Sequence, residues 1–576
     1  MTEPSTPQKF AFPRATALLA AFALSMSALA QPSAQAQTPP PAAAPAPPPA
    51  SPTATLPSPP APGATPGSPG APQSTSSASP APVVPANGST PPPIVVTPDN
   101  AQVAVGAQVR LAVGSVIGTI NATVADPNVV QVSVDQTGQA LVVFGKTPGS
   151  TVITVTDGRG MRRDVPVRVA YYAGSIPSNI SLAITGDPAT AEFVREQVVG
   201  AIRRAAQLQP GAQVVVDTDD VSFNGTLRQD RIATVNVAVL LQGAQYFEVD
   251  ATVHVSIRNV AAPRISPDSL MVSDYPERLE ENGTLFTADL RGQQPSRFLY
   301  FHYNPPGQPD RRIVLHADNR SGEPLTLQFI SGRGGPSNNE MAAGHAATRA
   351  FLVNALQNQG RLIEVPANSS MAIVTQDIPA GTIACNILQL RVLSGGASVH
   401  LTLSAESASG VASPSPDSGT LLEAAHKHAR GIYPIPEFHY ATQWNVNDEY
   451  LELPIGQIPL PNDLQGQALS GDYGVLQSFV VTLLNPNASP ASIAIYENPR
   501  GGRATGTYLI DGVLIQSHQT PPYSRYKIRQ YVVPARGFVR VTIVTMPEAG
   551  SSYPLKLIFA PDDGSVAPGG PGSPAY

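Results

Sequence analysis

The sequence is poor in charge and in cysteine. Charged side chains make up 13 % of its 576 residues, about half of the roughly 25 % found in an average globular protein. The formal net charge of −6 provides no positive field for nucleic acid or an anionic bilayer. The single cysteine, Cys385, excludes an intramolecular disulfide and a cysteine-based zinc cluster. Proline and glycine are abundant instead, with 62 and 47 residues, which excludes a single helical bundle.

Short catalytic motifs are absent as well. The chain contains no H-E-x-x-H, no G-x-S-x-G and no glycine-rich dinucleotide loop. Gly145-Lys146-Thr147 resembles the end of a phosphate loop, but the preceding Gly138 is seven positions away instead of five. Pro148 also prevents the helix that would hold the phosphate. We therefore predict a hairpin turn here and a non-enzymatic protein without catalytic, cofactor or metal residues.

Two groups of possible metal ligands have simpler explanations. Asp217, Asp219 and Asp220 lack the ligand spacing and the closing glutamate of a calcium loop, so we predict a polar turn. His426 and His428 lie on a short helix predicted over residues 421–429, where side chains two positions apart point about 200° from one another. We therefore expect a solvated face rather than a shared ion.

The first 93 residues predict export. Lys9 and Arg14 precede an uncharged apolar run that ends at Ala30, which is typical of a cleavable signal peptide over residues 1–30. No cysteine follows the run, so a lipoprotein anchor is excluded, and no later segment is apolar enough to span a bilayer. Residues 31–93 are rich in proline and alanine, and we expect a disordered linker. The protein is predicted to reach the periplasm, cell surface or medium of a bacterium.

Residues 94–262 predict two different β-rich domains. Between 94 and 173, short runs such as Val165–Val169, in which every second residue is apolar, alternate with turn signals. About 80 residues in about seven strands is the size of an immunoglobulin-like β-sandwich. Residues 174–262 predict a small α+β domain, with a helix that begins after an Asp187 N-cap and packs on a strand meander.

The remainder of the chain contains a duplication. Ile313–Asn319, followed by four residues and Pro324, matches Phe479–Asn485, followed by four residues and Pro490. Further matches follow in the same order while their offset drifts, as expected for one fold altered by loop insertions. The expected fold class is thus mainly β and multidomain. The expected second half comprises a β-sandwich copy A (263–406), a linker (407–419), a β-sandwich copy B (420–564) and a disordered tail (565–576).

The duplication also bears on local structure. We match the closing Leu401–Leu403 of copy A with Leu555–Leu557 of copy B. Residues 348–358 alone would pass for a helix, but the partner segment contains Gly506 and Gly512, which disfavour one. We therefore predict a loop or strand at 348–358.

A family resemblance is carried by three runs within residues 94–173. Val124–Val130, Leu141–Thr151 and Thr156–Gly160 resemble the N-terminal domain of the pilus-assembly secretin family. They also resemble bacterial Ig-like repeats of surface proteins, which share the G-K-x-x-G-x-T turn before a strand. The resemblance implies an Ig-like fold and a role in pilus assembly or secretion. Pore formation is not implied, because the glycine-rich amphipathic strands of a secretin pore module are not found.

One stretch is dense in aromatic residues. Trp444 lies near Tyr433, Tyr440 and Tyr450. Packing in a core or interface is the favoured interpretation, and an exposed platform that stacks on sugar rings is the alternative. Cys385 has apolar neighbours in the sequence and is expected to pack as a small hydrophobe.

These observations predict an exported, non-enzymatic structural or adhesive protein of the cell envelope or surface, which binds or scaffolds through tandem sandwiches. A first alternative is an accessory of pilus assembly or secretion. A second is a carbohydrate-binding protein or hydrolase that uses the region around Trp444. The expected partners are envelope or surface proteins or a polysaccharide, not nucleic acid. Exposed sandwich edges would also allow oligomers to form by strand addition.

Overall fold

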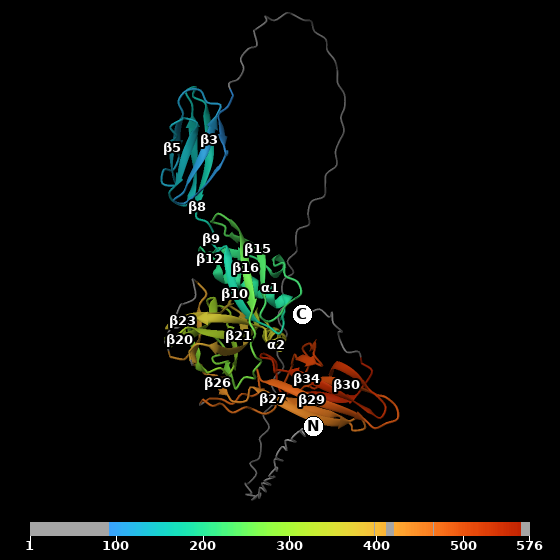
Figure 1. Cartoon of the computed structure of the whole chain (residues 1–576). Helices are drawn as coiled ribbons and strands as arrows, with labels where there is room; N and C mark the ends of the chain where they lie inside the picture. Colours follow the sequence, from blue (N-terminus) through green and yellow to red (C-terminus); the bar gives the residue numbers. More distant parts are fainter. Residues whose placement is uncertain (1–91, 397, 410–419, 465, 566–576) are drawn as a thin grey trace, which may run out of the picture. The chain divides into compact units, whose positions relative to one another are not determined.

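The computed structural model describes residues 92–396, 398–409, 420–464 and 466–565 (Figure 1). The predicted signal peptide (1–30) lies outside the described residues, as do nearly all of the predicted linker 31–93, most of the linker 407–419 and nearly all of the tail. Most of the described residues lie in strands, and two α-helices are found among them. The prediction of a mainly β, multidomain fold is therefore confirmed.

Residues 94–170 form a β-sandwich of two four-stranded sheets, ordered β1-β3-β6-β5 and β2-β8-β7-β4. Alternate residues of its strands face a shared core, in which Leu111, Val143 and Ile153 are fully buried. The strands are β1 (Val95–Thr97), β2 (Ala101–Ala104), β3 (Gln108–Gly114), β4 (Asn121–Val124), β5 (Val130–Val134), β6 (Ala140–Gly145), β7 (Gly149–Thr156) and β8 (Arg162–Ala170). Lys146 lies in the short turn between β6 and β7, which belong to different sheets, so the predicted hairpin turn is instead a connection between the two sheets.

The α+β unit places helix α1 (Ala191–Ala205) on a sheet. Phe193, Val198 and Ile202 of α1 are buried against that sheet. The N-cap is Thr190 rather than the predicted Asp187, because the Thr190 hydroxyl accepts the hydrogen bond from the Phe193 amide. The other elements are β9 (Gly174–Ser175), β10 (Asn179–Thr185), β11 (Ala189–Thr190), β12 (Gln207–Leu208), β13 (Gln213–Val215), the 3-10 helix η1 (Thr218–Asp220), β14 (Thr226–Leu227), β15 (Ile232–Gln242) and β16 (Val249–Asn259).

One ten-stranded sheet connects this unit to copy A and to the first strand of the copy B segment. Its order is β13-β15-β16-β10-β22-β21-β24-β19-β17-β26. Ile184 and Thr185 of β10 pair with Arg361 and Gly360 of β22, which belongs to copy A. At the other edge β26, which comes after the predicted linker 407–419, pairs with β17 of copy A. The sheet therefore continues across the boundaries that the sequence pattern predicts near residues 262 and 419.

Copies A and B share the arrangement of their matched strands. The strands of copy A are β17 (Ser269–Ser273), β18 (Gly283–Arg291), β19 (Ser296–Asn304), β20 (Arg311–Asn319), β21 (Leu325–Ser337), β22 (Gly360–Val365), β23 (Ser369–Ile378), β24 (Thr382–Ser394) and β25 (Ser398–Ser407). Those of the copy B segment are β26 (Arg430–Tyr433), β27 (Glu437–Asn445), β28 (Leu451–Ile455), β29 (Leu476–Asn485), β30 (Ala491–Pro499), β31 (Thr507–Ile510), β32 (Val513–Gln516), β33 (Tyr526–Val533), β34 (Gly537–Thr545) and β35 (Leu555–Pro561). In copy A, β20 pairs with β23, and β21 pairs with β22 and β24. In copy B, β29 pairs with β34, and β30 pairs with β33 and β35.

The same buried asparagine closes the corner after the first matched strand of each copy. Asn319 Nδ2 donates to the carbonyl oxygens of Glu323 (2.8 Å), Val365 (3.1 Å) and Pro366 (3.0 Å). Asn485 Nδ2 donates to those of Ser489 (2.9 Å), Val533 (3.1 Å) and Pro534 (3.1 Å). The Asn-x4-Pro match in the sequence is therefore a corner that each copy builds in the same way.

The strand pairing corrects one predicted match. β25, which contains Leu401–Leu403, lies between β18 and β20 of copy A. β35, which contains Leu555–Leu557, pairs with β28 and β30, as β24 pairs with β19 and β21. β35 is thus the counterpart of β24. β25 has no counterpart among the described residues of copy B, where β27 pairs directly with β29.

The prediction of a loop or strand at 348–358 is wrong, because α2 (Glu340–Leu356) is a helix there. Asn339 caps it, and Ala347 and Phe351 are buried. The helix packs closely on β21, where a Cβ atom at Gly334 would collide with the Ala343 carbonyl oxygen. Copy B has the hairpin β31–β32 at the corresponding place. The copies diverge here, so the glycines of one copy do not predict the structure of the other.

Candidate functional site

The two sandwiches meet through buried polar contacts. The Arg297 guanidinium of copy A is almost fully buried and lies 2.9 Å from Glu437 Oε1 of copy B. It also donates to the Pro436 carbonyl oxygen at 2.7 Å. On helix α2, His345 Nδ1 lies 2.9 Å from Oε2 of Glu548, a carboxylate without solvent exposure. These pairs join the copies through oriented contacts.

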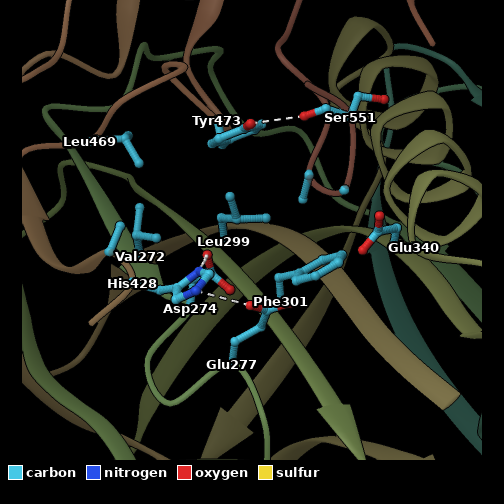
Figure 2. Close-up of a pocket in the computed structure, with 13 residues that line it drawn as sticks. Val272, Asp274, Glu277, Leu299, Phe301, Glu340, His428, Leu469, Tyr473 and Ser551 are labelled. Atoms are coloured by element: carbon cyan, nitrogen blue, oxygen red, sulfur yellow. Dashed lines mark hydrogen bonds and ion pairs between the residues drawn. The ribbon is translucent and has the colours of Figure 1, made fainter. Parts of the chain in front are cut away.

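A cavity of about 210 Å³ lies between the copies (Figure 2). Val272, Leu299 and Phe301 contribute its apolar wall from β17 and β19, and Leu469 adds to that wall from the copy B segment. Gly550 lies where α2 begins and has a φ of +79°. A Cβ atom at Gly550 would collide with the Glu340 carbonyl oxygen, so a larger residue would push α2 away. The cavity thus depends on the contact between α2 and the loop that follows β34.

The polar side of the cavity contains a histidine between two carboxylates. His428 Nδ1 lies 3.4 Å from Asp274 Oδ2, and His428 Nε2 lies 3.1 Å from Glu277 Oε2. The hydrogen bond to Asp274 raises the pKa of His428 above its ordinary value. Burial raises the pKa of Asp274 to about 7. The group is therefore able to change protonation near neutral pH.

Glu340 and Tyr473 complete the lining. Figure 2 shows Glu340 on one side of Phe301 and the His428–Asp274 pair on the other. Tyr473 donates its hydroxyl hydrogen bond to the Ser551 carbonyl oxygen at 2.8 Å. The Ser551 hydroxyl lies 2.8 Å from the Thr505 hydroxyl and accepts from the Thr505 amide, so it is not paired with His428 as a nucleophile would be. The arrangement offers negative charge and aromatic surface.

The sequence-predicted aromatic residues do not come together as an exposed platform. Trp444 is 4 % exposed in the core of copy B, and Tyr433 is fully buried at the junction, where its hydroxyl donates to the Gln467 carbonyl oxygen. Tyr440 and Tyr450 are 63 % and 46 % exposed. A sugar ring cannot reach the Trp444 indole in this arrangement, because the two sheets of the sandwich enclose it.

The remaining candidate residues named from the sequence have structural roles in the fold. Asp217 and Asp220 form a capping box at the start of η1 by accepting hydrogen bonds from the backbone amides of Thr218 and Asp217, which agrees with a polar turn. Cys385 is fully buried among apolar residues, as expected. Among the described residues, no group of three or more His, Cys, Asp or Glu is placed to hold a metal ion. Within the same residues, no helix has the length and hydropathy needed to cross a bilayer.

The prediction of a helix over residues 421–429 is wrong, because no helix forms there. His426 and His428 are exposed, as predicted, but His428 also contacts the carboxylates of Asp274 and Glu277. The reason is tertiary: Arg430 of β26 pairs with Ser273 of β17, which draws the residues before it into an extended path beside Asp274. Sequence reasoning missed the cavity because its lining residues come from six distant segments. No local motif signals them.

Comparison with known proteins assigns one segment to a family. Residues 97–170 match the family described as the pilus formation protein N-terminal region, which confirms the resemblance found in the sequence. The matched residues cover nearly all of the first β-sandwich. No curated protein matches the chain.

Similar solved structures cover parts of the chain. Domains 4 and 5 of the S-layer protein SbsC are 31 % identical over 13 % of this chain and 44 % of that one, with a TM-score of 0.12. A tri-modular endo-β-1,4-glucanase from Bacillus licheniformis is 10 % identical over 29 % of this chain and 38 % of that one, with a TM-score of 0.12. The Bacteroides ovatus protein SGBP-B is 10 % identical over 50 % of this chain and 72 % of that one, also with a TM-score of 0.12. This chain thus spans less than half of the first two, and TM-scores this low carry no weight for its fold or function.

Proposed function

We propose that this protein is a non-enzymatic component of a bacterial cell envelope that attaches to a pilus or secretion apparatus through residues 94–173. The two C-terminal sandwiches then serve as the scaffold that is held at that apparatus. The observation that carries the proposal is the match of residues 97–170 to a pilus formation region. The match falls on one complete sandwich with its own core, as expected for a module with a function of its own.

The connection of this sandwich to the α+β unit is short and specific. β8 ends at Ala170, and the next residues bond to one loop: the Phe247 amide donates to the Tyr171 carbonyl oxygen and the Ala173 amide donates to that of Phe247, each at 2.8 Å. The Arg168 guanidinium also lies 5.3 Å from the centre of the Phe247 ring. Only one end of the sandwich is used in this way. The edge strands β4 and β5 remain available for strand addition by a partner.

The C-terminal half supports a scaffold rather than a flexible array. The ten-stranded sheet crosses from the α+β unit through copy A to β26. The buried Arg297–Glu437 pair adds an oriented contact between the copies. A structural or adhesive surface protein without an apparatus would use the same scaffold, but it would not account for the family match. The buried position of Trp444 removes the observation that favoured sugar binding.

The sole native thiol makes the proposal testable by crosslinking. Cys385 is buried, so an engineered surface cysteine is the one site that a maleimide photocrosslinker can label in the folded protein. Gln131→Cys places it on the exposed edge strand β5, and Val532→Cys places it on copy B, where Val532 is 63 % exposed. We expect crosslinking in intact envelopes to join pilus or secretion components to the Gln131→Cys protein and not to the Val532→Cys protein. Equal products from both positions, or none from Gln131→Cys, would contradict the attachment proposed here.

A further inference from the structure

We propose that the cavity between copies A and B binds an alkylammonium or alkylguanidinium group, the chemistry found at the end of a lysine or arginine side chain. The inference does not depend on the attachment proposed for residues 94–173. It rests on the charge of the lining, on an unpaired buried carboxylate oxygen and on the aromatic walls. A free polyamine and a basic peptide are two sources of this chemistry.

The charge of the lining is one-sided. Asp274 and Glu277 supply carboxylates from the segment after β17 and Glu340 supplies one from α2, and none of the described residues that line the cavity is lysine or arginine. Glu340 has no ion-pair partner among the described residues. The nearby Arg430 pairs instead with Glu423 and donates to the Leu422 carbonyl oxygen. A phosphate or carboxylate ligand would be repelled here, whereas a cation is attracted.

Asp274 provides an independent indication of a missing positive partner. Its Oδ1 atom is buried and has no hydrogen-bond partner among the described residues, while Oδ2 faces His428 at 3.4 Å. The side chain as a whole is 25 % exposed, but a carboxylate oxygen that is buried without a donor is costly unless positive charge compensates it. His428 compensates it only when protonated, and it is shared with Glu277. The cavity beside them is where further positive charge would lower the free energy of the group.

The apolar walls determine which kind of cation fits. The Phe301 and Tyr473 rings line the cavity together with Leu299 and Val272. Aromatic faces attract ammonium and guanidinium groups, and aliphatic walls pack against an alkyl stem. A strongly hydrated metal ion would not use these walls, and the described histidine and carboxylates are not grouped as metal ligands. A volume of about 210 Å³ suits the end of one side chain rather than a folded motif.

Binding should depend on pH with a defined sign. The titratable groups that face the cavity are Asp274, Glu277, Glu340, His428 and Tyr473. A cationic ligand competes with protonated His428 for Asp274 and Glu277, and it requires Asp274 to be ionised. Burial raises the pKa of Asp274 to about 7. The affinity for the cation should therefore rise between about pH 6 and pH 8, and binding should release protons.

The test is calorimetric titration of the full chain with n-butylguanidinium and n-butylammonium, with n-butanol as the uncharged control. We expect saturable binding of the cations, about tenfold weaker for Glu340→Gln, which corresponds to loss of about 1.4 kcal/mol. Glu364→Gln makes the same charge change at an exposed position of β22 and should bind as the parent does. Unchanged protection of the buried Cys385 from a thiol reagent would show that copy A is folded in both variants, and unchanged Trp444 fluorescence would show the same for copy B.

Two further comparisons identify the source of the cation and test the proposal itself. Stronger binding of spermidine than of an acetylated arginine or lysine tripeptide would identify a free polyamine, and the reverse would identify a protein partner. Equal effects of Glu340→Gln and Glu364→Gln, stronger binding at about pH 6 than at about pH 8, or no saturation by any cation would overturn the proposal. None of these outcomes depends on the crosslinking experiment.

Discussion

Replacing the corner asparagines by alanine should destabilise copies A and B by similar amounts. Asn319 and Asn485 are 1 % and 2 % exposed, and each Nδ2 contacts three carbonyl oxygens. Each amide has two hydrogens for those three acceptors, and each Oδ1 accepts a backbone amide two residues later. Alanine removes the two hydrogen bonds that the Nδ2 hydrogens can donate and the one that Oδ1 accepts. At about 0.5–1.5 kcal/mol for each of these three bonds, and with buried carbonyls left unpaired, the free energy of unfolding should fall by about 2–4 kcal/mol per copy.

The chain carries one natural reporter for each copy. Trp444, the sole tryptophan, is buried in the core of copy B, so its fluorescence during a urea titration follows that copy. Cys385, the sole cysteine, is buried in β24 of copy A, and burial raises the pKa of its thiol. Its reaction with a thiol reagent therefore follows the opening of copy A. Asn485→Ala should shift the tryptophan transition, and Asn319→Ala should speed the thiol reaction.

The matched control is Asn487→Ala, which removes an exposed asparagine two residues from Asn485. Its side chain bonds to the exposed Asn447 at 2.8 Å, so the cost should stay within about 0.5 kcal/mol. If Asn319→Ala and Asn485→Ala each cost less than about 1 kcal/mol, or if only one copy were affected, the corner would not be the shared structural device inferred here.

Three further outcomes follow from buried groups. Arg297→Met leaves Glu437 without its buried guanidinium partner at the junction and should cost about 3–5 kcal/mol in a chemical denaturation series, with partial recovery when Glu437→Gln is added. Burial alone would lower the pKa of His345, but Glu548 raises it above the ordinary value. His345 should therefore make its full contribution to stability below its unfolded pKa of about 6.5, and this contribution should disappear as the pH rises through the folded pKa. The difference in urea midpoint between the parent and His345→Gln, measured against pH, checks this, and a difference that grows with pH would refute it. Trp444→Ala should lower the stability of copy B by about 3–5 kcal/mol, measured by thermal circular dichroism.

The corner that copies A and B share was readable from the sequence because it is a local structure. The asparagine, its turn and the following proline lie within six residues, and their spacing is the same in both copies. The partner carbonyls lie about 50 residues later at most, at the equivalent end of the matched strands. Local geometry of this kind preserves residue types, so the pattern remains visible after the loops have diverged.

Helix α2 shows where the same reasoning fails. Its sequence alone is compatible with a helix, and the comparison with copy B argued against it, yet Gly332 and Gly334 of β21 provide the close packing surface on which it forms. Copy B has the β31–β32 hairpin instead. A duplicated pattern predicts the shared strands, whereas an element added in one copy depends on the surface that it covers.

The cavity could not be predicted from the sequence. Asp274 and His428 are brought together by the pairing of β17 with β26, and Glu340 faces them because α2 packs against the loop at Gly550. Each residue is unremarkable in its own segment, and the unpaired carboxylate arises only when the two sandwiches meet.

The sequence by itself determined the mainly β character of the chain, the pilus-type segment at residues 97–170 and the repeat in its second half. These properties follow from alternating apolar residues, turn residues and fixed short spacings, all of which involve residues that are close together along the chain. Only the tertiary structure decided that one sheet joins three predicted domains, that Trp444 lies in a core and that His428 lies between carboxylates. Those results depend on which edges and faces pair across long separations, and residue types at one position do not encode the partner that another segment will supply.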